Sequence, residues 1–412
     1  MKSSTFVMAD KIDLLAGLAE VRAAAKRIEG RVLRTPSIVC DSLSRALGAT
    51  VILKLDNLQA TGAFKERGAA NKLATLTESE RKNGVITVSA GNHAQAVARH
   101  ASLLGIDATI VMPKTTPVTK VTRTQSWGVR VVLEGEDFTE STQIAYRLMA
   151  EQGRVFVHPY DDAAIVAGQG TLTLELLEDH PEINVLLMPV GGGGLLAGAA
   201  LVARALNPKI EVYGVEVAAY APMAQRLAHQ PVAVGGPTIA EGIAVRDIGE
   251  YPFHIAEQLG LEVLVVSERA IEEAVALLVE SAKLVGEGAG VAGLAALMSN
   301  RERFAGKVIG IPISGGNIDA RILSNVLMRN LLRDGRLLRL NLEIPDRPGV
   351  LADIATKIGV SGGNIIEVSH QRLFGSPSVQ AAILEVMIEA RDPQHAAEIT
   401  NKLAESYVVN RI

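Results

Sequence analysis

Four consecutive glycines, Gly191 to Gly194, limit the possible folds of this chain more than any other segment. They lie within 19 uncharged residues, Val185 to Ala203, a run long enough to span a bilayer. Pro189 and the glycines argue against a continuous spanning helix, because both residue types disfavour helix interiors. The run is therefore predicted to form a buried strand, a glycine loop and a buried helix, and no membrane association is expected.

A glycine loop between a strand and a helix is suited to binding an anion. The glycines let the backbone approach a ligand closely, and the first N–H groups of the following helix, 195–206, favour a phosphate. The competing interpretation is a dinucleotide site, since Gly192, Gly194 and Ala197 fit the pattern G-x-G-x-x-A. Glu216 follows about twenty residues later, where such sites place an acid. This pattern is weak, and it leaves three other polar loops without a function.

Strands and helices alternate over most of the chain, which predicts an α/β protein with open, twisted, parallel sheets. The expected strands are 51–55, 85–88, 108–112, 129–133, 155–157, 184–190, 211–217 and 307–313. Open α/β sheets bind ligands at the carboxyl ends of their strands. The loops that follow these strands are therefore expected to meet in one crevice.

Three further strand ends carry polar residues. Lys65 lies where a loop turns into a helix, and the helix dipole there favours the neutral, nucleophilic amine. Asn92 and Ser314 follow the strands 85–88 and 307–313. Taken singly, these residues are a surface lysine, a helix cap and a turn. Together with the glycine loop they suit pyridoxal phosphate: a lysine for its aldehyde, glycines for its phosphate, Asn92 for its 3-oxygen and Ser314 for its pyridine nitrogen.

Four motifs connect the chain to a known family. They are Gln59-Ala60-Thr61-Gly62-Ala63-Phe64-Lys65 with Arg67-Gly68-Ala69, Ser89-Ala90-Gly91-Asn92-His93-Ala94-Gln95, the tetraglycine loop, and Ser314-Gly315-Gly316-Asn317. From about Leu14 to Arg333, the chain resembles the threonine ammonia-lyases (threonine dehydratases) of the tryptophan-synthase-β-like, fold-type-II pyridoxal-phosphate family. The resemblance implies a large domain of about 1–55 and 156–333, with a smaller domain of about 56–155 inserted in it.

The resemblance also assigns the site residues. Lys65 is the catalytic residue. The implied cofactor-binding residues are Phe64, Lys65, Asn92, Gly191, Gly192, Gly193, Gly194, Leu195, Gly242 and Ser314. The implied substrate-binding residues are Ser89, Ala90, Gly91, Asn92 and His93.

The implied reaction is α,β-elimination of threonine to 2-oxobutanoate and ammonia, or of serine to pyruvate and ammonia. A hydroxyaspartate ammonia-lyase and a serine racemase or dehydratase share all four motifs and stay open as alternatives. Related racemases carry serine at the position of Ala90, so its absence favours elimination. Asp56 stands where the family commonly has glutamate, and little effect is expected. Racemase-like members bind a divalent cation near Glu216, and for this chain the metal stays open, because Tyr220 and Pro222 follow instead of further ligands.

The tail, 337–412, is predicted to be a separate ferredoxin-like α+β domain of βαββαβ order, after a polar linker at 333–336. Asp346-Arg347-Pro348-Gly349 and Gly362-Gly363-Asn364-Ile365 make it resemble an ACT domain, an amino-acid-sensing module. Gly349, Asn364 and Ile365 are the implied regulatory residues. Isoleucine biosynthesis under allosteric control by an amino-acid effector is then expected, with a pure assembly role as the alternative.

Charge and cysteine content limit the partners. The formal net charge of −4 gives no reason to expect nucleic acid. The single cysteine, Cys40, suits a reducing cytoplasm, and Asp10, Lys11 and Asp13 interrupt any signal peptide. We expect a cytoplasmic homo-oligomer, a dimer or tetramer, that acts on a small amino acid.

Overall fold

The computed structural model describes residues 12–371 and 381–412; Asp10 and Lys11, on which the signal-peptide expectation partly rests, lie outside these ranges. The chain divides into two compact units, Met1–Ile318 and Asp319–Ile412. Helix α15 (Ala320–Arg333) belongs to the second unit, where it contacts strand β11 (Leu337–Pro345). The sequence suggests a boundary after this helix, whereas the contacts place the division before it.

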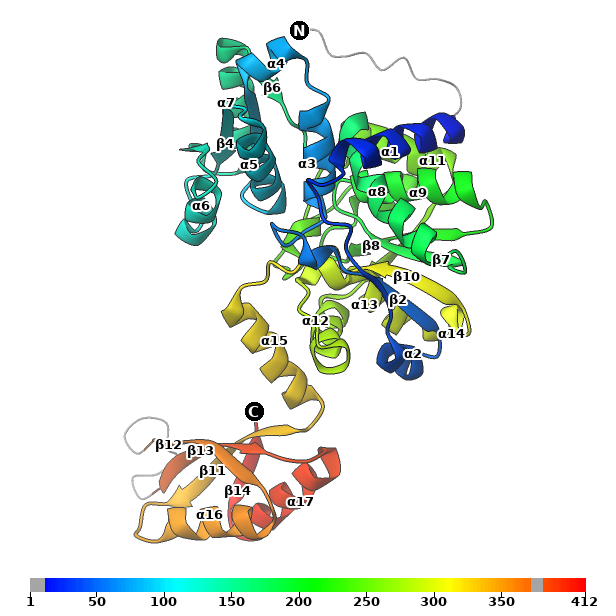
Figure 1. Ribbon diagram of the computed structural model, residues 1–412. Coiled ribbons are helices and arrows are strands. Elements are labelled where there is room, and N and C mark those ends of the chain that lie inside the picture. The colour runs from blue at the N-terminus through cyan, green and yellow to red at the C-terminus, as the bar shows by residue number, and fades with distance from the viewer. Residues whose placement is uncertain (1–11, 372–380) are drawn as a thin grey trace. The chain divides into compact units, whose positions relative to one another are not determined.

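The larger sheet of the first unit has the strand order β1-β2-β10-β7-β8-β9, and all its strands except β1 run parallel (Figure 1). Its strands are β1 (Ser37–Val39), β2 (Thr50–Lys54), β7 (Val185–Pro189), β8 (Glu211–Val217), β9 (Glu262–Val266) and β10 (Val308–Pro312). Helices α1, α8, α9 and α11 cover one face of this sheet and α12 and α13 the other (Figure 1). These helices are α1 (Leu14–Ile28), α8 (Ala163–Asp179), α9 (Gly194–Leu206), α11 (Glu250–Gln258), α12 (Glu268–Leu277) and α13 (Ala292–Ser299).

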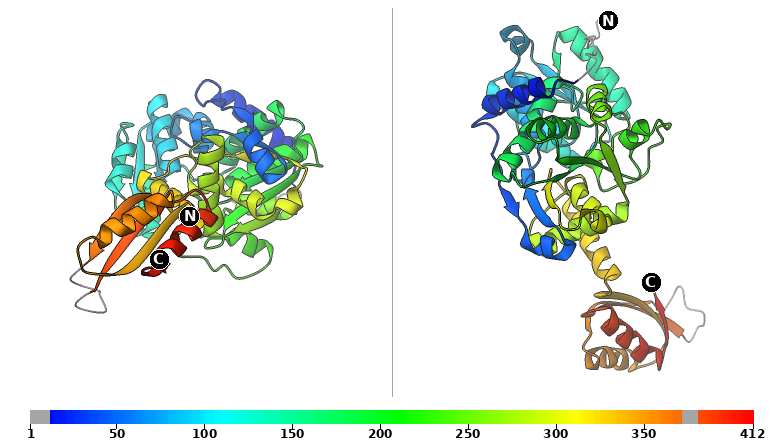
Figure 2. Two further views of the ribbon diagram at one scale, coloured as in Figure 1. Left: turned by 90° about the horizontal axis from the view of Figure 1, so that it is seen from below. Right: turned by 90° about the vertical axis from the view of Figure 1, so that its right-hand side faces the viewer.

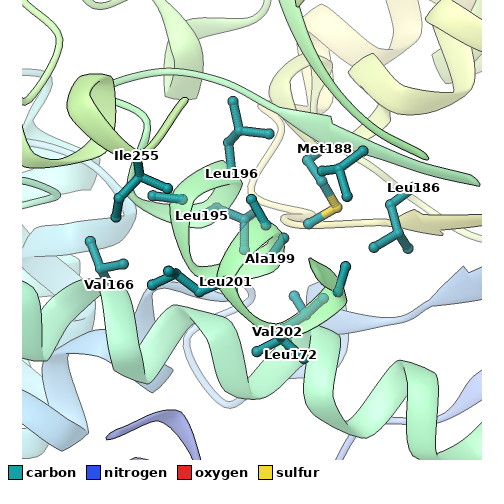
Figure 3. Close-up of a cluster of buried hydrophobic side chains, with 14 of the residues drawn as sticks. Val166, Leu172, Leu186, Met188, Leu195, Leu196, Ala199, Leu201, Val202 and Ile255 are labelled. Carbon is teal, nitrogen blue, oxygen red and sulfur yellow. The ribbon is translucent and has the colours of Figure 1, made fainter. Parts of the chain in front are cut away.

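The core of this unit is built around α9. Every residue of α9 from Gly194 to Ala203 is buried, as expected for a helix without a polar face. Figure 3 shows Leu195, Leu201 and Val202 of this helix among Leu186 and Met188 of β7, with further side chains from α8 and α11 around them. The predicted strand, glycine loop and buried helix are thus confirmed. Among the described residues, no helix is long and apolar enough to cross a bilayer.

The smaller sheet of the first unit has the order β5-β4-β3-β6 and is parallel throughout. Alternate residues of β3 and β4 pack on opposite faces: Ile110 and Met112 contact α3 and α5, whereas Ile86 and Val111 contact α7. Its elements are α3 (Lys65–Ala74), α4 (Glu78–Asn83), β3 (Val85–Val88), α5 (Asn92–Leu104), β4 (Ala108–Met112), α6 (Val118–Gln125), β5 (Arg130–Leu133), α7 (Phe138–Gln152) and β6 (Val155–Phe156).

The C-terminal unit has the predicted βαββαβ order. Its antiparallel sheet, β12-β13-β11-β14, carries α16 and α17 on one face, and their apolar sides form its core (Figure 2). The elements are β11, α16 (Val350–Val360), β12 (Asn364–Gln371), β13 (Ala381–Glu389), α17 (Pro393–Ala404) and β14 (Val408–Arg411). The sequence predicts the second strand of this unit over 365–372, and the last of these residues, Arg372, lies outside the described residues.

Short helices complete the first unit. They are α2 (Asp41–Leu47), η1 (Asp56–Leu58), α10 (Pro222–Leu227), η2 (Glu241–Ile243), the π-helical η3 (Leu278–Ala282), η4 (Gly288–Val291) and α14 (Arg301–Phe304). Because β2, β10 and β7 are parallel neighbours, their carboxyl ends lie side by side. The lysine loop, the Ser314 loop and the glycine loop all begin at this edge.

Candidate active site

The lysine loop and the Ser314 loop are joined through their backbones. Phe64 donates its N–H to the carbonyl of Ser314 at 2.9 Å, and Gly316 donates to the carbonyl of Gly62, also at 2.9 Å. Gly62 has φ +76°, a conformation that favours glycine. These bonds fix Lys65 as the first residue of α3, at the helix N-terminus that the sequence predicts.

The environment of Lys65 makes its amine easier to deprotonate. Its Nζ donates a hydrogen bond to the carbonyl of Pro159 at 2.8 Å. Burial lowers the pKa of Lys65 to about 8, because the charged form loses hydration there. No carboxylate among the described residues forms an ion pair with Lys65 to offset this effect. A lysine with these properties is suited to nucleophilic attack on a carbonyl.

The lowered pKa of Lys65 leads to a pH prediction. The rate at which pyridoxal phosphate bonds to the cofactor-free protein should rise from pH 6 to about 8 and then level off, because only the neutral amine attacks. The growth of visible absorbance after mixing measures this rate. A rate that keeps rising toward pH 10.5 would show that the burial of Lys65 does not tune its amine.

The glycine loop is closely packed on one side. A Cβ on Gly192 would lie 2.1 Å from the ring of Tyr160, and one on Gly193, at φ +94°, would lie 2.7 Å from Pro252. The first intrahelical bond of α9 runs from the N–H of Ala197 to the carbonyl of Gly193. The N–H groups of Gly194 and Leu195 therefore have no intrahelical partner and are suited to holding a phosphate.

The Asn92 side chain joins three of the loops. Its Nδ2 donates to Oε1 of Glu287 at 2.7 Å, and its Oδ1 accepts from Nδ2 of Asn317 at 2.8 Å. Asn317 also donates to the carbonyl of Thr61 at 2.7 Å, which ties this network to the lysine loop. The structure thus brings the Lys65, Asn92 and Ser314 loops together, as the sequence predicts.

Gly242 and Gly315 border the same network. A Cβ on Gly315 would meet Oε1 of Glu287, and one on Gly242 would lie 3.5 Å from the same oxygen. Gly191 lies against Gly242, since its Cβ would be 3.2 Å from the Gly242 carbonyl. Gly242 therefore lies between the glycine loop and the Asn92 network. Glu287 and Tyr160 also belong to this region, although the sequence interpretation missed both.

Comparisons with known proteins agree with this geometry. The family model described as pyridoxal-phosphate dependent enzyme matches residues 28–315. This chain belongs to that family. It is 40% identical over 395 residues to the L-threonine ammonia-lyase of Thermotoga maritima, covering 95% of this chain and 98% of that one.

Two solved structures resemble this pyridoxal-phosphate-dependent enzyme. The processed form of threonine deaminase isoform 2 from Solanum lycopersicum matches with a TM-score of 0.73 and 31% identity, over 79% of this chain and 90% of that one. Maize serine racemase matches with a TM-score of 0.71 and 34% identity, over 77% and 98% of the two chains. The predicted fold class and the cofactor, pyridoxal 5'-phosphate, are confirmed.

The segment Ser89–His93 is only partly open. Ser89 accepts a hydrogen bond from the N–H of Gly91 at 3.2 Å, and Ala90 packs against the core of the smaller sheet. His93 is buried, with Nε2 3.1 Å from the carbonyl of Val157. Burial and the nearby Lys65 lower the pKa of His93 to about 3, so this ring is neutral. Substrate binding by these residues stays a prediction.

Glu216 acts as a helix cap in the described structure. Its carboxylate accepts from the N–H groups of Met223 and Ala224, both at 2.9 Å, at the start of α10. Burial raises the pKa of Glu216 to about 7. The described residues contain no group of three potential acidic, histidine or cysteine ligands that would hold a metal.

The predicted regulatory residues occupy ordinary structural positions in the C-terminal unit. Gly349, at φ +90°, caps the start of α16. Asn364 donates from Nδ2 to Oε2 of Glu389 at 3.1 Å, and Ile365 packs against the core. Effector binding by these three residues stays a prediction.

Proposed function

We propose that this enzyme converts L-threonine to 2-oxobutanoate and ammonia, and L-serine to pyruvate and ammonia. The observation that carries the proposal is Lys65: its pKa is lowered, and it starts a helix beside the Ser314 and Asn92 loops. The threonine ammonia-lyase of Thermotoga maritima, similar over nearly its whole length, supports this choice of reaction.

Each loop has a task in this reaction. Lys65 would hold the cofactor through its aldehyde, and the neutral Lys65 amine would take the proton from the substrate Cα. The N–H groups at the start of α9 would hold the cofactor phosphate. Ser314 offers the pyridine nitrogen a neutral hydroxyl. Pyridoxal phosphate, when bound, supplies the electron sink that makes the Cα proton acidic. The Cα–H and Cβ–OH bonds break to release water and an enamine, and the released enamine takes up one water to yield the oxoacid and ammonia.

The alternative is a racemase or another β-hydroxy amino acid lyase, because maize serine racemase is also similar. Ala90 favours elimination, since a racemase needs an acid on the opposite face of the substrate. The test is a panel of L-threonine, L-serine, D-serine and 3-hydroxyaspartate, assayed for ammonia, oxoacid and chirality. We expect ammonia and 2-oxobutanoate from L-threonine and no D-serine from L-serine. Dominant racemisation, or turnover of 3-hydroxyaspartate alone, would replace the proposal.

We also propose that the enzyme is a cytoplasmic homo-oligomer, a dimer or tetramer, in isoleucine biosynthesis. The C-terminal unit would then sense a branched-chain amino acid. The βαββαβ order supports an ACT-like module, and such effectors act through coupling energies of about 1–3 kcal/mol.

A regulatory prediction follows for the C-terminal unit. Isoleucine or valine should change the threonine dependence of the full chain, whereas a chain ending at Ile318 should keep the lyase activity without this response. Parallel titrations of both proteins, with light scattering for the oligomeric state, measure the effect. A full-length enzyme that ignores every amino acid tested would leave the unit with an assembly role only.

A further inference from the structure

Four side chains from distant parts of the sequence form a continuous hydrogen-bonded chain, which is tied to the lysine loop through the carbonyl of Thr61. Arg123 of α6 donates to Oδ1 of Asn317 at 3.3 Å. Asn317 donates from Nδ2 to Oδ1 of Asn92, and Asn92 donates from Nδ2 to Oε1 of Glu287. We call these four residues the Asn92 relay.

The direction of the relay is fixed at Asn317. The carbonyl of Thr61 can only accept and Arg123 can only donate, so Nδ2 of Asn317 must face Thr61 and its Oδ1 must face Arg123. Nδ2 of Asn317 has two hydrogens, one for Thr61 and one for Asn92. Asn92 therefore turns its Oδ1 toward Asn317.

Glu287 fixes the other end. An ionised carboxylate only accepts hydrogen bonds, so it holds Nδ2 of Asn92 at 2.7 Å. One of the two Nδ2 hydrogens of Asn92 is used in this bond. Among the described residues, the other hydrogen has no acceptor. The remaining hydrogen is available to the anionic ring oxygen of pyridoxal phosphate.

We propose that Glu287 is a positioning residue, which keeps the Asn92 amide turned so that it donates to the cofactor's ring oxygen. The proposal rests on the proposed function only in that pyridoxal phosphate binds beside Lys65. Protonation of Glu287 would add an O–H that can donate to Oδ1 of a turned-over Asn92, so the carboxyl would no longer select one orientation of the amide. The amide would then lose its anchor, and its carbonyl oxygen would face an anion when turned over.

The groups around Glu287 shift its pKa in both directions. Burial raises the pKa of Glu287 to about 7, the Asn92 bond lowers it, and the backbone N–H of Asn317 also lowers it. Two other charged groups act on it: Glu241 raises the pKa and Lys120 lowers it, and these two pair with each other at 2.7 Å. No cation pairs directly with Glu287 among the described residues.

The test is a double-mutant cycle on the binding of pyridoxal phosphate, measured by fluorescence titration without substrate. Glu287→Leu removes the acceptor and should weaken cofactor binding about tenfold or more. In an Asn92→Ala background, the same change should have little further effect, because Glu287 then has no amide to orient. Additive effects of the two substitutions would overturn the proposal.

Glu287→Gln is the conservative variant. Its Oε1 still accepts from Asn92, so cofactor affinity should stay within about threefold of the wild type, which is the size of an altered but retained hydrogen bond. The pH dependence of the cofactor's visible absorbance should lose a step near pH 7 that the wild type shows. An unchanged step would assign that titration to another group and overturn the role of the Glu287 charge.

These readouts separate the inference from the proposed function. A wild-type protein that binds no pyridoxal phosphate contradicts both. A protein that binds the cofactor and deaminates threonine, but gives an additive cycle, contradicts the role of Glu287 alone. A non-additive cycle in an enzyme that ignores threonine supports Glu287 and contradicts the proposed substrate.

Discussion

Replacement of Lys65 by alanine is expected to lower ammonia release from threonine by about 1,000-fold or more. The variant loses both the covalent bond to the cofactor and the base that removes the Cα proton. The backbone bonds between the lysine loop and the Ser314 loop place this residue at the start of α3. The measurement is steady-state ammonia and 2-oxobutanoate formation with added pyridoxal phosphate.

The matched control is Lys114→Ala, which removes an exposed lysine paired with Glu136 at 2.8 Å. It should keep wild-type turnover and a visible absorbance band that borohydride abolishes. The Lys65→Ala protein should bind the cofactor, but borohydride should not reduce it onto the protein. Turnover of the Lys65→Ala protein near the wild-type value would end the assignment.

The loops of the site could be predicted from the sequence because each follows a short apolar strand. Parallel strands place such loops at one sheet edge, so Lys65, Ser314 and the glycine loop were expected to converge. The strand positions were also clear, as in β3 and β4, where the runs are β-branched and bounded by loop residues.

Glu287 could not be found in this way because it follows no strand. It lies between η3 and η4, and its partner Asn92 is 195 residues earlier in the sequence. The available signal was an acid beside Gly286 and Gly288, where a surface turn is the ordinary interpretation. Only the packing, which places the carboxylate against Gly315, shows that it belongs to the site.

Three local expectations from the sequence differ from the structure. The sequence marks 69–76 as the helix-like run that follows the lysine loop, whereas α3 already begins at Lys65. Glu66 and Arg67 suggest a solvated turn, yet both side chains are buried and paired. Strand β9 was missed, because no strand was expected between residues 217 and 307, although Val263 to Val266 is an apolar run.

Arg67 lies in a buried charge network under the lysine loop. Its guanidinium donates to Asp56 at 2.6 Å and to Glu175 of α8 at 2.8 Å. Lys54, at the end of β2, pairs with Glu175 at 2.7 Å. Arg67, Asp56 and Lys54 are fully buried, so each charge depends on the others for compensation. The network connects α3 to β2 and α8, which together position Lys65.

Replacement of Arg67 by methionine should therefore destabilise the first unit by about 3–5 kcal/mol, because the buried Asp56 and the partly buried Glu175 are left with one lysine. Urea unfolding followed by the fluorescence of Trp127, the only tryptophan, measures the loss. Arg269→Met is the control: this exposed arginine pairs with Glu273 on one helix, and its loss should cost less than about 1 kcal/mol.

The loss of unfolding free energy in the Arg67→Met protein should also depend on pH. In the wild type, Arg67 and further hydrogen bonds hold the pKa of Asp56 below its ordinary value despite burial, so this stabilisation is present above pH 3.8 and lost as the pH falls. Without Arg67, burial should raise the pKa of Asp56, and protonation then relieves the uncompensated charge. The difference in unfolding free energy should thus be larger at pH 7 than at pH 4.5. An equal deficit at both values would mean that lost packing, and not the unpaired carboxylate, causes the destabilisation.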